Sequence, residues 1–286
     1  MPAGTDFSPN FAAMATFEEA APRYDSSGAR LAGPIADRLV GLAGLRPGDR
    51  VLDVGCRSGA VTIRSARVIS PGGQVIGLDL AAGMLRRTAA DAAGLGLNNV
   101  SVRRGDASRP PFAPGSMDVV LASLVPYLLP DPAAALRHWH EVVRPGGTVA
   151  FSWGIHPDPR WSPVFSAVDA YAKGARGTGG FESCIRRLGS PADMAGVLDA
   201  AGYTGVRMAT HTVPVRYTGP RQCWQASRAD ELRLAWQHIP DADRDAARRA
   251  AFTLLAAMGE PDGSLVRYVE TAYAVAQRPF AGAAAR

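Results

Sequence analysis

The chain has 286 residues, of which 47% are hydrophobic and 20% are charged, values that are typical of a globular protein with a packed core. No window approaches the roughly 18 uninterrupted apolar residues that a membrane-spanning helix needs, and the first twenty residues lack the basic start and apolar run of a signal peptide. The formal net charge of +5 comes from scattered arginines rather than from a basic run, so the sequence argues against nucleic-acid binding.

From residue 35 to residue 153, short apolar runs alternate with stretches of helical patterning. Strands that are regularly separated by helices favour a parallel sheet with helices on both faces, so this part of the chain is predicted to have an α/β fold. The predicted strands are 51–54, 74–78, 99–104, 118–122 and 148–152, and the predicted helices are 59–68, 81–95 and 132–143.

The pattern changes after residue 152. Residues 153–187 are rich in glycine, proline and aromatic residues and are predicted to form a cap or loop region. Ser190 and Pro191 suit the N-cap and first position of a helix that runs to about residue 201. A second helical stretch, 227–258, is expected to break near Pro240. Predicted strands at 205–215 and 270–278 return to the sheet, so the helical stretches are interpreted as insertions near its end.

The strongest local signal is the sequence VLDVGCRSG at residues 51–59. A strand that runs into glycines and then into a helix is the arrangement with which open parallel sheets bind adenosine-containing cofactors, at the carboxyl ends of the strands. Glycine permits the tight turn and lets a ligand approach the backbone. The spacing of Gly55 and Gly59 is not the G-x-G-x-x-G of a dinucleotide site, which disfavours a nicotinamide-dependent oxidoreductase.

Three further signals follow the glycine loop in order. Asp79 ends the second predicted strand, where a carboxylate can accept both ribose hydroxyls. Asp106 follows the third strand, where a carboxylate can accept from an adenine amino group. Residues 144–147, with the sequence RPGG, form a predicted turn just before the fifth strand.

In this order and spacing, the four motifs resemble the class I S-adenosylmethionine-dependent methyltransferases, in the small-molecule branch similar to the enzymes of ubiquinone and menaquinone biosynthesis. The resemblance covers residues 24–153 well and continues more loosely through 200–203 and 276–279. It implies a Rossmann-like, seven-stranded, mostly parallel sheet with an antiparallel last strand and a helical cap inserted near the C-terminal strands. It also implies S-adenosylmethionine as the cofactor, bound over strands one, two and four.

The resemblance also implies a role for individual residues. Asp79 holds the ribose, Asp106 with Ala107 meets the adenine, and Ser123 lies beneath the sulfonium. The remaining positions are Asp53, Gly55 and Gly59 at the methionine end, Leu80 and Met84 beside the adenosine, and Tyr24 covering the cofactor.

Two positions depart from the family pattern. Relatives usually have glycine where this chain has Arg57, and an arginine with a positive φ costs about 1–2 kcal/mol. Arg57 either pairs with the methionine carboxylate of the cofactor or weakens its binding. Many relatives also have two histidines after strand four, where this chain has Tyr127 and Leu128.

Candidates for a general base are few. His156 follows the fifth strand on the side where ligands bind, and histidine titrates in the useful range. Tyr127 is the second catalytic candidate. His138 is expected in solvent, His140 at the edge of its helix's apolar stripe, and His211 and His238 in structural positions. Methyl transfer is a displacement at a positively charged sulfur, so positioning can suffice without a base.

Cysteines and acidic residues indicate no metal site. Cys56, Cys184 and Cys223 are scattered and odd in number, which disfavours a zinc site or a disulfide framework and predicts a reducing, cytoplasmic location. The aspartates at 53, 79 and 106 are already assigned to the cofactor. Aromatic residues of the expected cap are interpreted either as core or as an apolar lid over an organic substrate: Trp153, Trp161, Phe165, Tyr171 and Phe181.

The sequence is therefore interpreted as a single methyltransferase domain, 1–286, that methylates a small, hydrophobic acceptor, most readily at an oxygen of a natural product or quinone-like phenol. The alternative is a methyltransferase-like protein that acts as a cyclase or isomerase, with the cofactor structural or absent. No nucleic-acid or membrane partner is expected, and a homodimer is possible. The expected organisation is an N-terminal helical segment (1–34), a cofactor-binding core (35–153), cap insertions (154–204 and 216–265) and returning strands (205–215 and 266–279).

Overall fold

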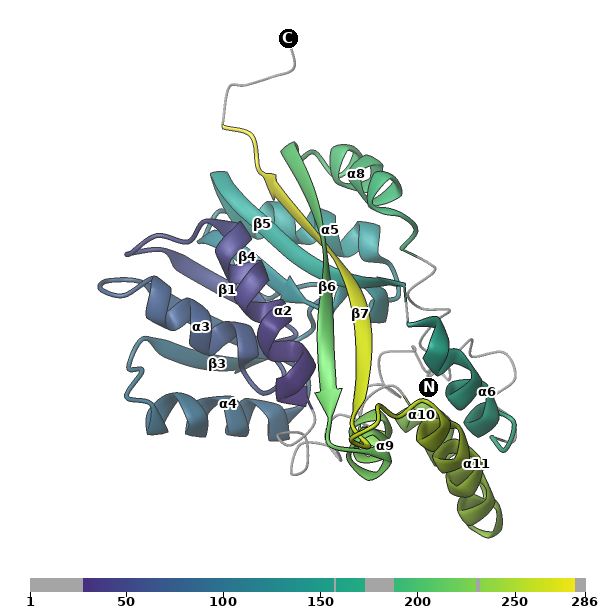
Figure 1. The fold of residues 1–286 in the computed structure, drawn as a ribbon. Helices are drawn as coiled ribbons and strands as arrows, with labels where there is room; N and C mark the ends of the chain where they lie inside the picture. The colour runs from purple at the N-terminus through teal and green to yellow at the C-terminus, as the bar shows by residue number, and fades with distance from the viewer. Residues whose placement is uncertain (1–27, 157, 173–187, 230–231, 281–286) are drawn as a thin grey trace, which may run out of the picture.

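The computed structural model describes residues 28–156, 158–172, 188–229 and 232–280. Its centre is a seven-stranded sheet with the order β3-β2-β1-β4-β5-β7-β6 (Figure 1). Strands β1 to β5 are parallel, and β7 runs antiparallel to both β5 and β6. The strands are β1 (Arg50–Val54), β2 (Gln74–Asp79), β3 (Val100–Arg104), β4 (Met117–Ser123), β5 (Val143–His156), β6 (Thr204–Tyr217) and β7 (Leu265–Gln277). This is the predicted α/β, Rossmann-like class.

Helices cover both faces of this sheet. One face carries α2 (Gly28–Ala43), α3 (Ala60–Val68) and α4 (Ala82–Gly94), and the other carries α5 (Pro132–Val142) and α8 (Pro191–Ala200) (Figure 1). The central strands are buried on both faces because helices lie on each side, and their apolar runs therefore need no alternation with polar residues. Helix α8 begins as predicted, with Ser190 and Asp193 forming a reciprocal capping box and Pro191 at the first position.

The remaining helices form a cap at one end of the sheet. Helix α6 (Ser162–Asp169) follows β5 through the short helix η3 (Pro159–Trp161). Helices α9 (Pro220–Ala229), α10 (Arg233–Gln237) and α11 (Arg244–Ala257), with the short η4 (Asp241–Asp243), lie between β6 and β7. Helix α6 packs against α11, so the two insertions join into one unit. The predicted break near Pro240 is confirmed, between α10 and η4.

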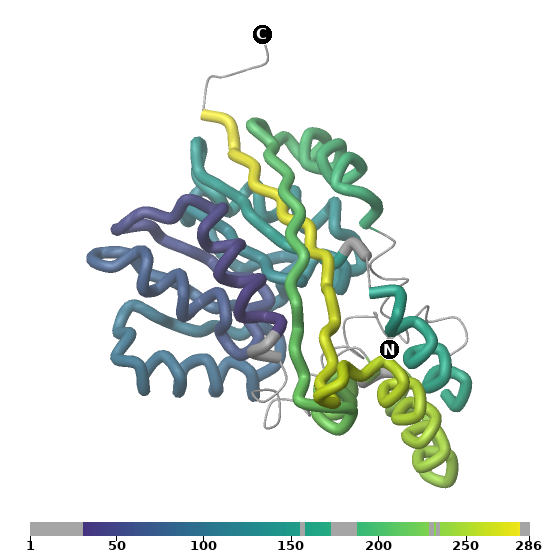
Figure 2. Tube along the Cα trace, in the orientation of Figure 1, coloured from purple at the N-terminus to yellow at the C-terminus, as the bar shows by residue number. Residues whose placement is uncertain are grey.

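Strands β6 and β7 extend past the end of β5 and continue together as a two-stranded ribbon, which Figure 2 shows running down to the cap. The last paired residue of β5 is His156, opposite Glu270, whereas β6 and β7 remain paired as far as Tyr217 and Leu265. Because β7 is antiparallel to β5, this extension passes the carboxyl ends of the parallel strands. The cap therefore sits at the edge of the sheet where α/β proteins bind ligands.

Several boundaries differ from the predicted ones. Strand β5 starts at Val143 rather than at residue 148, because Val143 already pairs with Met117 before the register shifts. It also extends to His156, so Trp153 lies in the strand rather than in the cap. Strand β7 starts at Leu265, five residues before the predicted 270, because pairing with β6 holds a segment that includes Arg267, Tyr268 and Glu270.

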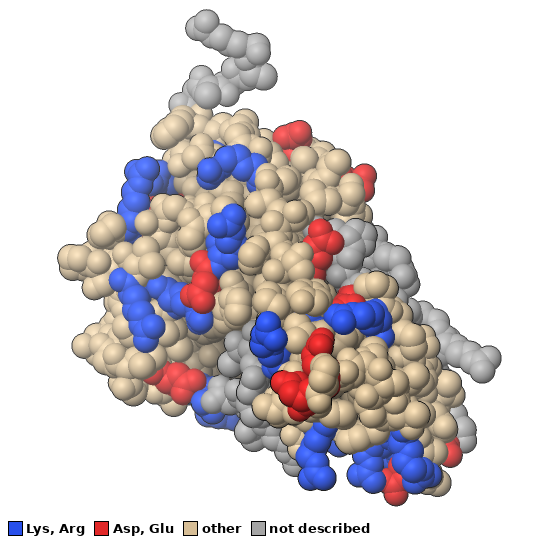
Figure 3. All heavy atoms as spheres, viewed as in Figure 1, with Lys and Arg blue, Asp and Glu red and all other residues tan. Residues whose placement is uncertain are grey.

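In the part of the chain that the structure describes, no helix is long and apolar enough to cross a membrane. On the face shown in Figure 3, arginine side chains lie in separate groups with acidic and uncharged residues between them. This distribution agrees with the absence of a basic run in the sequence.

Candidate functional site

Four of the predicted site residues lie in a row along the carboxyl edge of the sheet. Parallel pairing brings the ends of β3, β2, β1 and β4 to one edge in that spatial order. Asp106 follows β3, Asp79 ends β2, Asp53 is the penultimate residue of β1, and Ser123 ends β4. Residues far apart in sequence thus form one continuous surface, as the motif order predicts.

The glycine loop connects β1 to α3 at the centre of this row. Gly55 has φ 67°, and a Cβ on it would come within 2.6 Å of the Val125 side chain. Gly59 has φ 82°, and a Cβ there would come within 2.7 Å of Thr88. Both positions therefore require glycine for backbone conformation and for space.

Asp79 is the hub of the hydrogen bonds behind the loop. Its Oδ2 accepts from the backbone N–H of Arg57 at 2.9 Å, and its Oδ1 accepts from that of Ala81 at 2.9 Å. Its own carbonyl accepts from Gly105 N–H at 3.0 Å, which places the start of the Asp106 turn beside it. Burial raises the pKa of Asp79, and the backbone hydrogen bonds and the positive charge of Arg57 oppose that rise. Each carboxylate oxygen can accept a further bond, so the group retains capacity for two hydroxyls.

Asp53 lies almost fully buried below the loop, with 1% of its surface exposed. Its Oδ2 accepts from the Thr62 hydroxyl of α3 at 2.5 Å. Burial is the main cause that raises its pKa to about 7. A nearby cation would favour the ionised form of this buried carboxyl group, which burial alone disfavours.

Ser123 and Ser152 lie side by side at the ends of β4 and β5. Their hydroxyl oxygens are 3.4 Å apart, and Leu124 N–H donates to both the carbonyl and the hydroxyl of Ser152. Leu124 adopts φ 57°, and these bonds hold its peptide in that conformation. Asp53 pairs with Leu121, and Ser123 is two residues further along β4, so Asp53 and Ser123 share the face that α2 and α3 cover.

A recess of about 340 Å³, part of it open to solvent, lies between the glycine loop, the end of β4 and the start of α2. Among the described residues, Arg57 and Leu124 are the two that have a positive φ without being glycine, and both line this recess. Such strain persists where surrounding contacts fix it, and it concentrates at ligand sites. The recess is lined by Ala32, Asp53, Gly55, Cys56, Arg57, Ser58, Ala60, Val61, Ser123 and Leu124.

The Asp106 turn is fastened to helix α5. Asp106 Oδ1 accepts from Ser108 N–H at 2.8 Å, while the Ala107 carbonyl accepts from Trp139 Nε1 at 2.7 Å. His138 Nδ1 lies 3.0 Å from the Ser108 carbonyl. The expectation that His138 lies in solvent is therefore wrong: it is half-buried, because the turn after β3 folds over that side of the helix.

Two other residues that were predicted to contact the adenosine lie after the end of β2. Leu80 directly follows Asp79 and is half-buried, whereas the Met84 side chain in the first turn of α4 is fully buried. Ala107 is buried and holds Trp139, so its backbone has a structural role besides any contact with a ligand.

The two catalytic candidates lie further along the same edge. Tyr127 is in the short helix η2 (Pro126–Leu128) after β4 and is buried. His156 is the last residue of β5 and lies opposite Glu270 of β7. The structure describes its backbone but not its side chain. Tyr24 and Phe181 lie outside the described residues.

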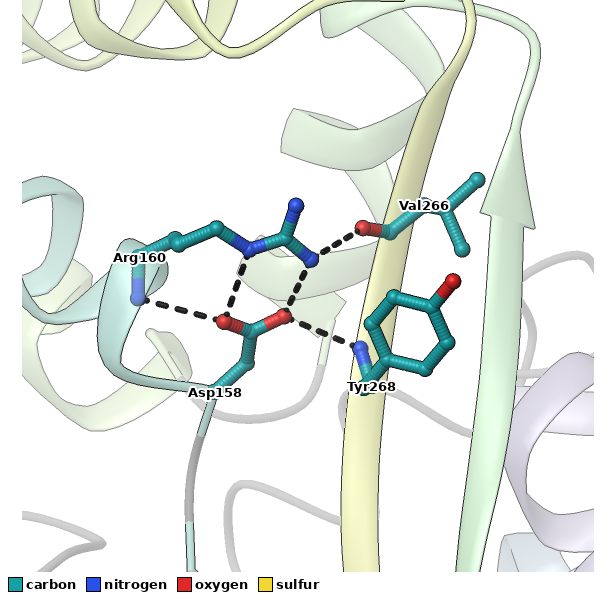
Figure 4. A network of polar contacts seen from close by, with 4 residues as sticks. All are labelled: Asp158, Arg160, Val266 and Tyr268. Carbon is teal, nitrogen blue, oxygen red and sulfur yellow. Dashed lines mark hydrogen bonds and ion pairs between the residues drawn. The ribbon is translucent and has the colours of Figure 1, made fainter.

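The cap is fastened to β7 by a polar network that the sequence did not reveal (Figure 4). Asp158 is 6% exposed and forms an ion pair with Arg160, whose Nε and Nη2 lie 3.0 and 2.6 Å from the two carboxylate oxygens. Asp158 also accepts from Tyr268 N–H at 3.0 Å, and Arg160 donates to the Val266 carbonyl at 2.8 Å. On the other side of the strand, the guanidinium of Arg267 stacks on the Phe165 ring of α6.

The cap has an aromatic core of its own. Trp224 of α9 makes edge contacts with Trp236 of α10 and Phe252 of α11. Trp161 is buried at the end of η3, while Phe165 and Tyr171 are partly buried against the core. The cap therefore packs around aromatic residues of its own, at the end of the sheet where β5 stops and the β6–β7 ribbon continues.

The residues at the edge fit a cofactor that is at once a nucleoside and an amino acid. Asp79 and Asp106 supply acceptors at adjacent strand ends, as a ribose and an adenine amino group require. Asp53 and Arg57 are both among the residues that line the recess, and their charges are opposite to those of the ammonium and carboxylate of an α-amino acid. Groups of three or more metal-ligating side chains are absent from the described part of the chain.

Sequence reasoning missed the side chains that hold the site in place. Thr62 and Thr88 bind Asp53 and the Arg57 carbonyl, and Trp139 binds Ala107. Only Thr62 had a visible signal, since it lies nine residues after Asp53 on the helix that follows the glycine loop. The bonds of Thr88 and Trp139 span 31 and 32 residues, and nothing in their local patterns indicates them.

A family model described as a methyltransferase domain matches residues 51–147. The chain is 36% identical over 243 residues to a nocamycin O-methyltransferase of Saccharothrix syringae, covering 81% of this chain and 86% of the relative. It is 34% identical to an aklanonic acid methyltransferase of Streptomyces sp. strain C5, covering 53% and 64% of the two chains. It is 29% identical to a demethylmenaquinone methyltransferase of Listeria monocytogenes serotype 4a, covering 68% and 89%.

Solved structures share the fold. A protein of Bacillus halodurans C-125 assigned as a methyltransferase superposes with a TM-score of 0.56 at 19% identity, over 85% of this chain and 98% of the other. The cyclase SpnF superposes with a TM-score of 0.54 at 20% identity, over 87% and 82%. The sheet order, the glycine loop and the identity to the nocamycin enzyme agree. The chain belongs to the class I S-adenosylmethionine-dependent methyltransferases.

Proposed function

We propose that the protein transfers the methyl group of S-adenosylmethionine to an oxygen atom of a small, largely apolar organic acceptor of natural-product or quinone-like type. The observation that carries this proposal is the row of Asp106, Asp79, Asp53 and Ser123 along one edge, next to a helical cap with an aromatic core. The row suits the cofactor and the cap suits an apolar acceptor.

Individual residues divide the cofactor between them in this proposal. Asp79 binds the ribose hydroxyls, Asp106 with Ala107 binds the adenine amino group, and Leu80 and Met84 flank the nucleoside. Asp53 and the glycine loop hold the amino-acid end, Ser123 lies near the sulfur, and Tyr24 covers the site. Bound S-adenosylmethionine supplies a methyl group on a positively charged sulfur, which an acceptor oxygen can displace.

The chain contributes mainly by positioning. Hydrogen bonds to Ser152 and Thr88 fix the backbone at Leu124 and Arg57, so the edge is ordered before a ligand arrives. His156 and Tyr127 follow the ends of β5 and β4 and are the groups proposed to accept the acceptor's proton. Acidic phenols and enols ionise without such help, so the need for a base depends on the acceptor.

The names of two relatives and the composition of the cap support the proposed acceptor class. The nocamycin relative is named as an O-methyltransferase, and another relative is named for aklanonic acid. The cap carries Trp224, Trp236 and Phe252 as its own core, and large planar organic molecules suit such aromatic surroundings. The two described cysteines, Cys56 and Cys223, are buried free thiols, in keeping with the proposed reducing, cytoplasmic location.

Cyclisation without methyl transfer is the second candidate, and the fold similarity to SpnF is compatible with it. That similarity is at 20% identity, whereas the 36% identity to the nocamycin enzyme extends over 81% of this chain. Methyl transfer is therefore favoured. Transfer of a labelled methyl group to any acceptor would exclude the second candidate.

The proposed cofactor site is tested by calorimetric titration with S-adenosylhomocysteine. We expect Asp79→Asn and Asp106→Asn each to weaken binding by roughly 1–3 kcal/mol, because each loses a charge-assisted hydrogen bond. Asp91→Asn is the matched control, since Asp91 pairs with Arg87 on the surface of α4. Unchanged affinity in both edge variants would show that the nucleoside binds elsewhere.

A further inference from the structure

Arg57 occupies a backbone position that suits glycine. Its φ of 49° lies in the left-handed region, which an arginine side chain disfavours. The peptide is held there from both sides: its N–H donates to Asp79 Oδ2 at 2.9 Å, and its carbonyl accepts from Thr88 Oγ1 at 2.8 Å. Neither bond uses the side chain, so a glycine would make both of them without strain.

The side chain must therefore account for the arginine. Arg57 lines the same recess as Asp53, Ser58 and Ser123, and its positive charge also acts on Asp79 at the end of β2. Asp53 and Arg57 place one negative and one positive group around a single small space. An α-amino acid in its zwitterionic form carries one charge opposite to each of these two residues.

We propose that the guanidinium of Arg57 binds the α-carboxylate of the cofactor's methionine end and so selects intact cofactor over nucleosides that lack the amino-acid part. This inference rests on the proposed cofactor site and deepens it. The strain at Arg57 is then the structural cost of a contact that glycine cannot make. The contact strengthens binding of both S-adenosylmethionine and its demethylated product, because both carry the carboxylate.

Two ligands separate this role from a structural one. S-Adenosylhomocysteine has the ribose, the adenine and the amino-acid end, whereas 5′-methylthioadenosine has the ribose, the adenine and the sulfur but no amino-acid end. In Arg57→Gln, which keeps a side chain of similar length without its charge, calorimetry should show S-adenosylhomocysteine binding weakened roughly 10- to 100-fold. Binding of 5′-methylthioadenosine should change less than about twofold. Arg57→Lys should recover part of the lost affinity, because a lysine retains the charge but not the planar pair of donors.

Arg57→Gly supplies an independent readout. It should lose the same affinity for S-adenosylhomocysteine, while the melting temperature of the ligand-free protein rises by about 2–4 °C as the strain is relieved. Weaker binding together with a higher melting temperature is the opposite of what general damage to the fold produces.

Other results overturn the proposal in distinct ways. An equal loss for both nucleosides would mean that Arg57 acts on Asp79 and the ribose instead. Unchanged affinity for both would mean that the arginine is merely tolerated. If the natural protein bound neither ligand, the proposed cofactor site itself would be wrong, and the role of Arg57 would fall with it.

Discussion

Asp53 illustrates how burial alone gives a residue a pH-dependent role. The carboxyl group is 1% exposed, and burial raises its pKa to about 7, although the Thr62 hydroxyl donates to it. Below that pH the free protein holds Asp53 mostly protonated, and above it mostly ionised. A ligand whose ammonium group approaches Asp53 binds to the ionised form.

Cofactor affinity should therefore fall as the pH drops below about 7. Binding a cation to ionised Asp53 releases the proton that the free protein carries at lower pH, so the dissociation constant should rise by up to about tenfold per pH unit. Titration of S-adenosylhomocysteine at pH 5.5, 6.5, 7.5 and 8.5 measures this slope, and calorimetry in two buffers measures the released proton.

Asp53→Asn is the control for this prediction. An asparagine does not ionise, so its affinity should be weaker at pH 8 and nearly constant with pH. A slope that persists in the variant would assign the titration to another group. The slope is read between pH 5.5 and 7.5, because the ligand's carboxyl group titrates well below this range and its ammonium group at about pH 8.

His156 and Tyr127 are the two candidates for the group that accepts the acceptor's proton. If His156 accepts the acceptor's proton, His156→Gln should lower turnover at least tenfold while the affinity for S-adenosylhomocysteine stays within about twofold. Tyr127→Phe is its counterpart at the end of β4. Both are assayed with aklanonic acid and simple hydroxyquinones as acceptors, and wild-type turnover in both variants would mean that no base is needed.

At the scale of elements, the turn after β3 depends on a helix far away in the sequence. Trp139 of α5 donates to the Ala107 carbonyl at 2.7 Å, next to Asp106. Trp139→Phe should lower the free energy of unfolding by about 1–3 kcal/mol, because a buried carbonyl loses its donor. It should also weaken S-adenosylhomocysteine binding, whereas Trp236→Phe in the cap should leave that binding unchanged. Denaturant unfolding and calorimetry measure the two effects.

The Asp158–Arg160 pair connects elements in the same way. Arg160 bridges η3 to the start of β7, and Asp158 is nearly buried between them. Arg160→Met should speed hydrogen exchange in α6 and in residues 265–268. The free energy of local opening there should fall by about 1–2 kcal/mol, a figure that allows for the 45% exposure of the Arg160 side chain. Cofactor affinity should stay unchanged.

Arg144→Met is the matched control for that prediction. Arg144 also forms an ion pair with an aspartate, Asp118, but at the opposite end of the sheet. Its loss should leave exchange in the cap as it is in the natural protein. Equal effects of the two variants on the cap would mean that the Asp158–Arg160 pair does not fasten it.

Patterns in the sequence predicted the elements whose identity depends on local residues. The apolar runs of β1, β2 and β4 and the capping box of α8 are local signals, and each element lies within about two residues of its predicted position. The ends of β5 and β7 were placed wrongly because pairing with a neighbouring strand, rather than composition, holds those residues. The edge of the site was predictable for the related reason that strand order brings its motifs together.

The bonds that hold the cap against β7 could not be predicted from the sequence. The Asp158–Tyr268 and Arg160–Val266 bonds join residues 110 and 106 positions apart, and each partner has an ordinary local pattern. His138 was predicted in solvent because its helix alone was considered. The roles of Tyr24, Arg57 and the other site residues remain predictions until binding is measured.

At the scale of the whole molecule, the cofactor edge and the cap are separate bodies that meet at one end of the sheet (Figure 1). S-Adenosylhomocysteine should therefore slow backbone exchange in residues 55–59, 79–84, 106–108 and 123–128, while α11 keeps its unliganded rate. Asp79→Asn, studied at the same ligand concentration, should lose this protection. Equal protection of α11 would mean that the cap also contacts the cofactor.

The β6–β7 ribbon has a consequence for how such enzymes diversify. Tyr217 and Leu265 are direct neighbours across the ribbon, so residues 218–264 leave the sheet and return to it at adjacent backbone positions. The two ends of that segment are about 5 Å apart, a gap that a hairpin turn or a different helical insert also closes. A gene could therefore exchange this stretch as one cassette while every codon for the cofactor edge stays untouched. New acceptors would then arise by recombination at two fixed points, without repeated trial at the site of methyl transfer.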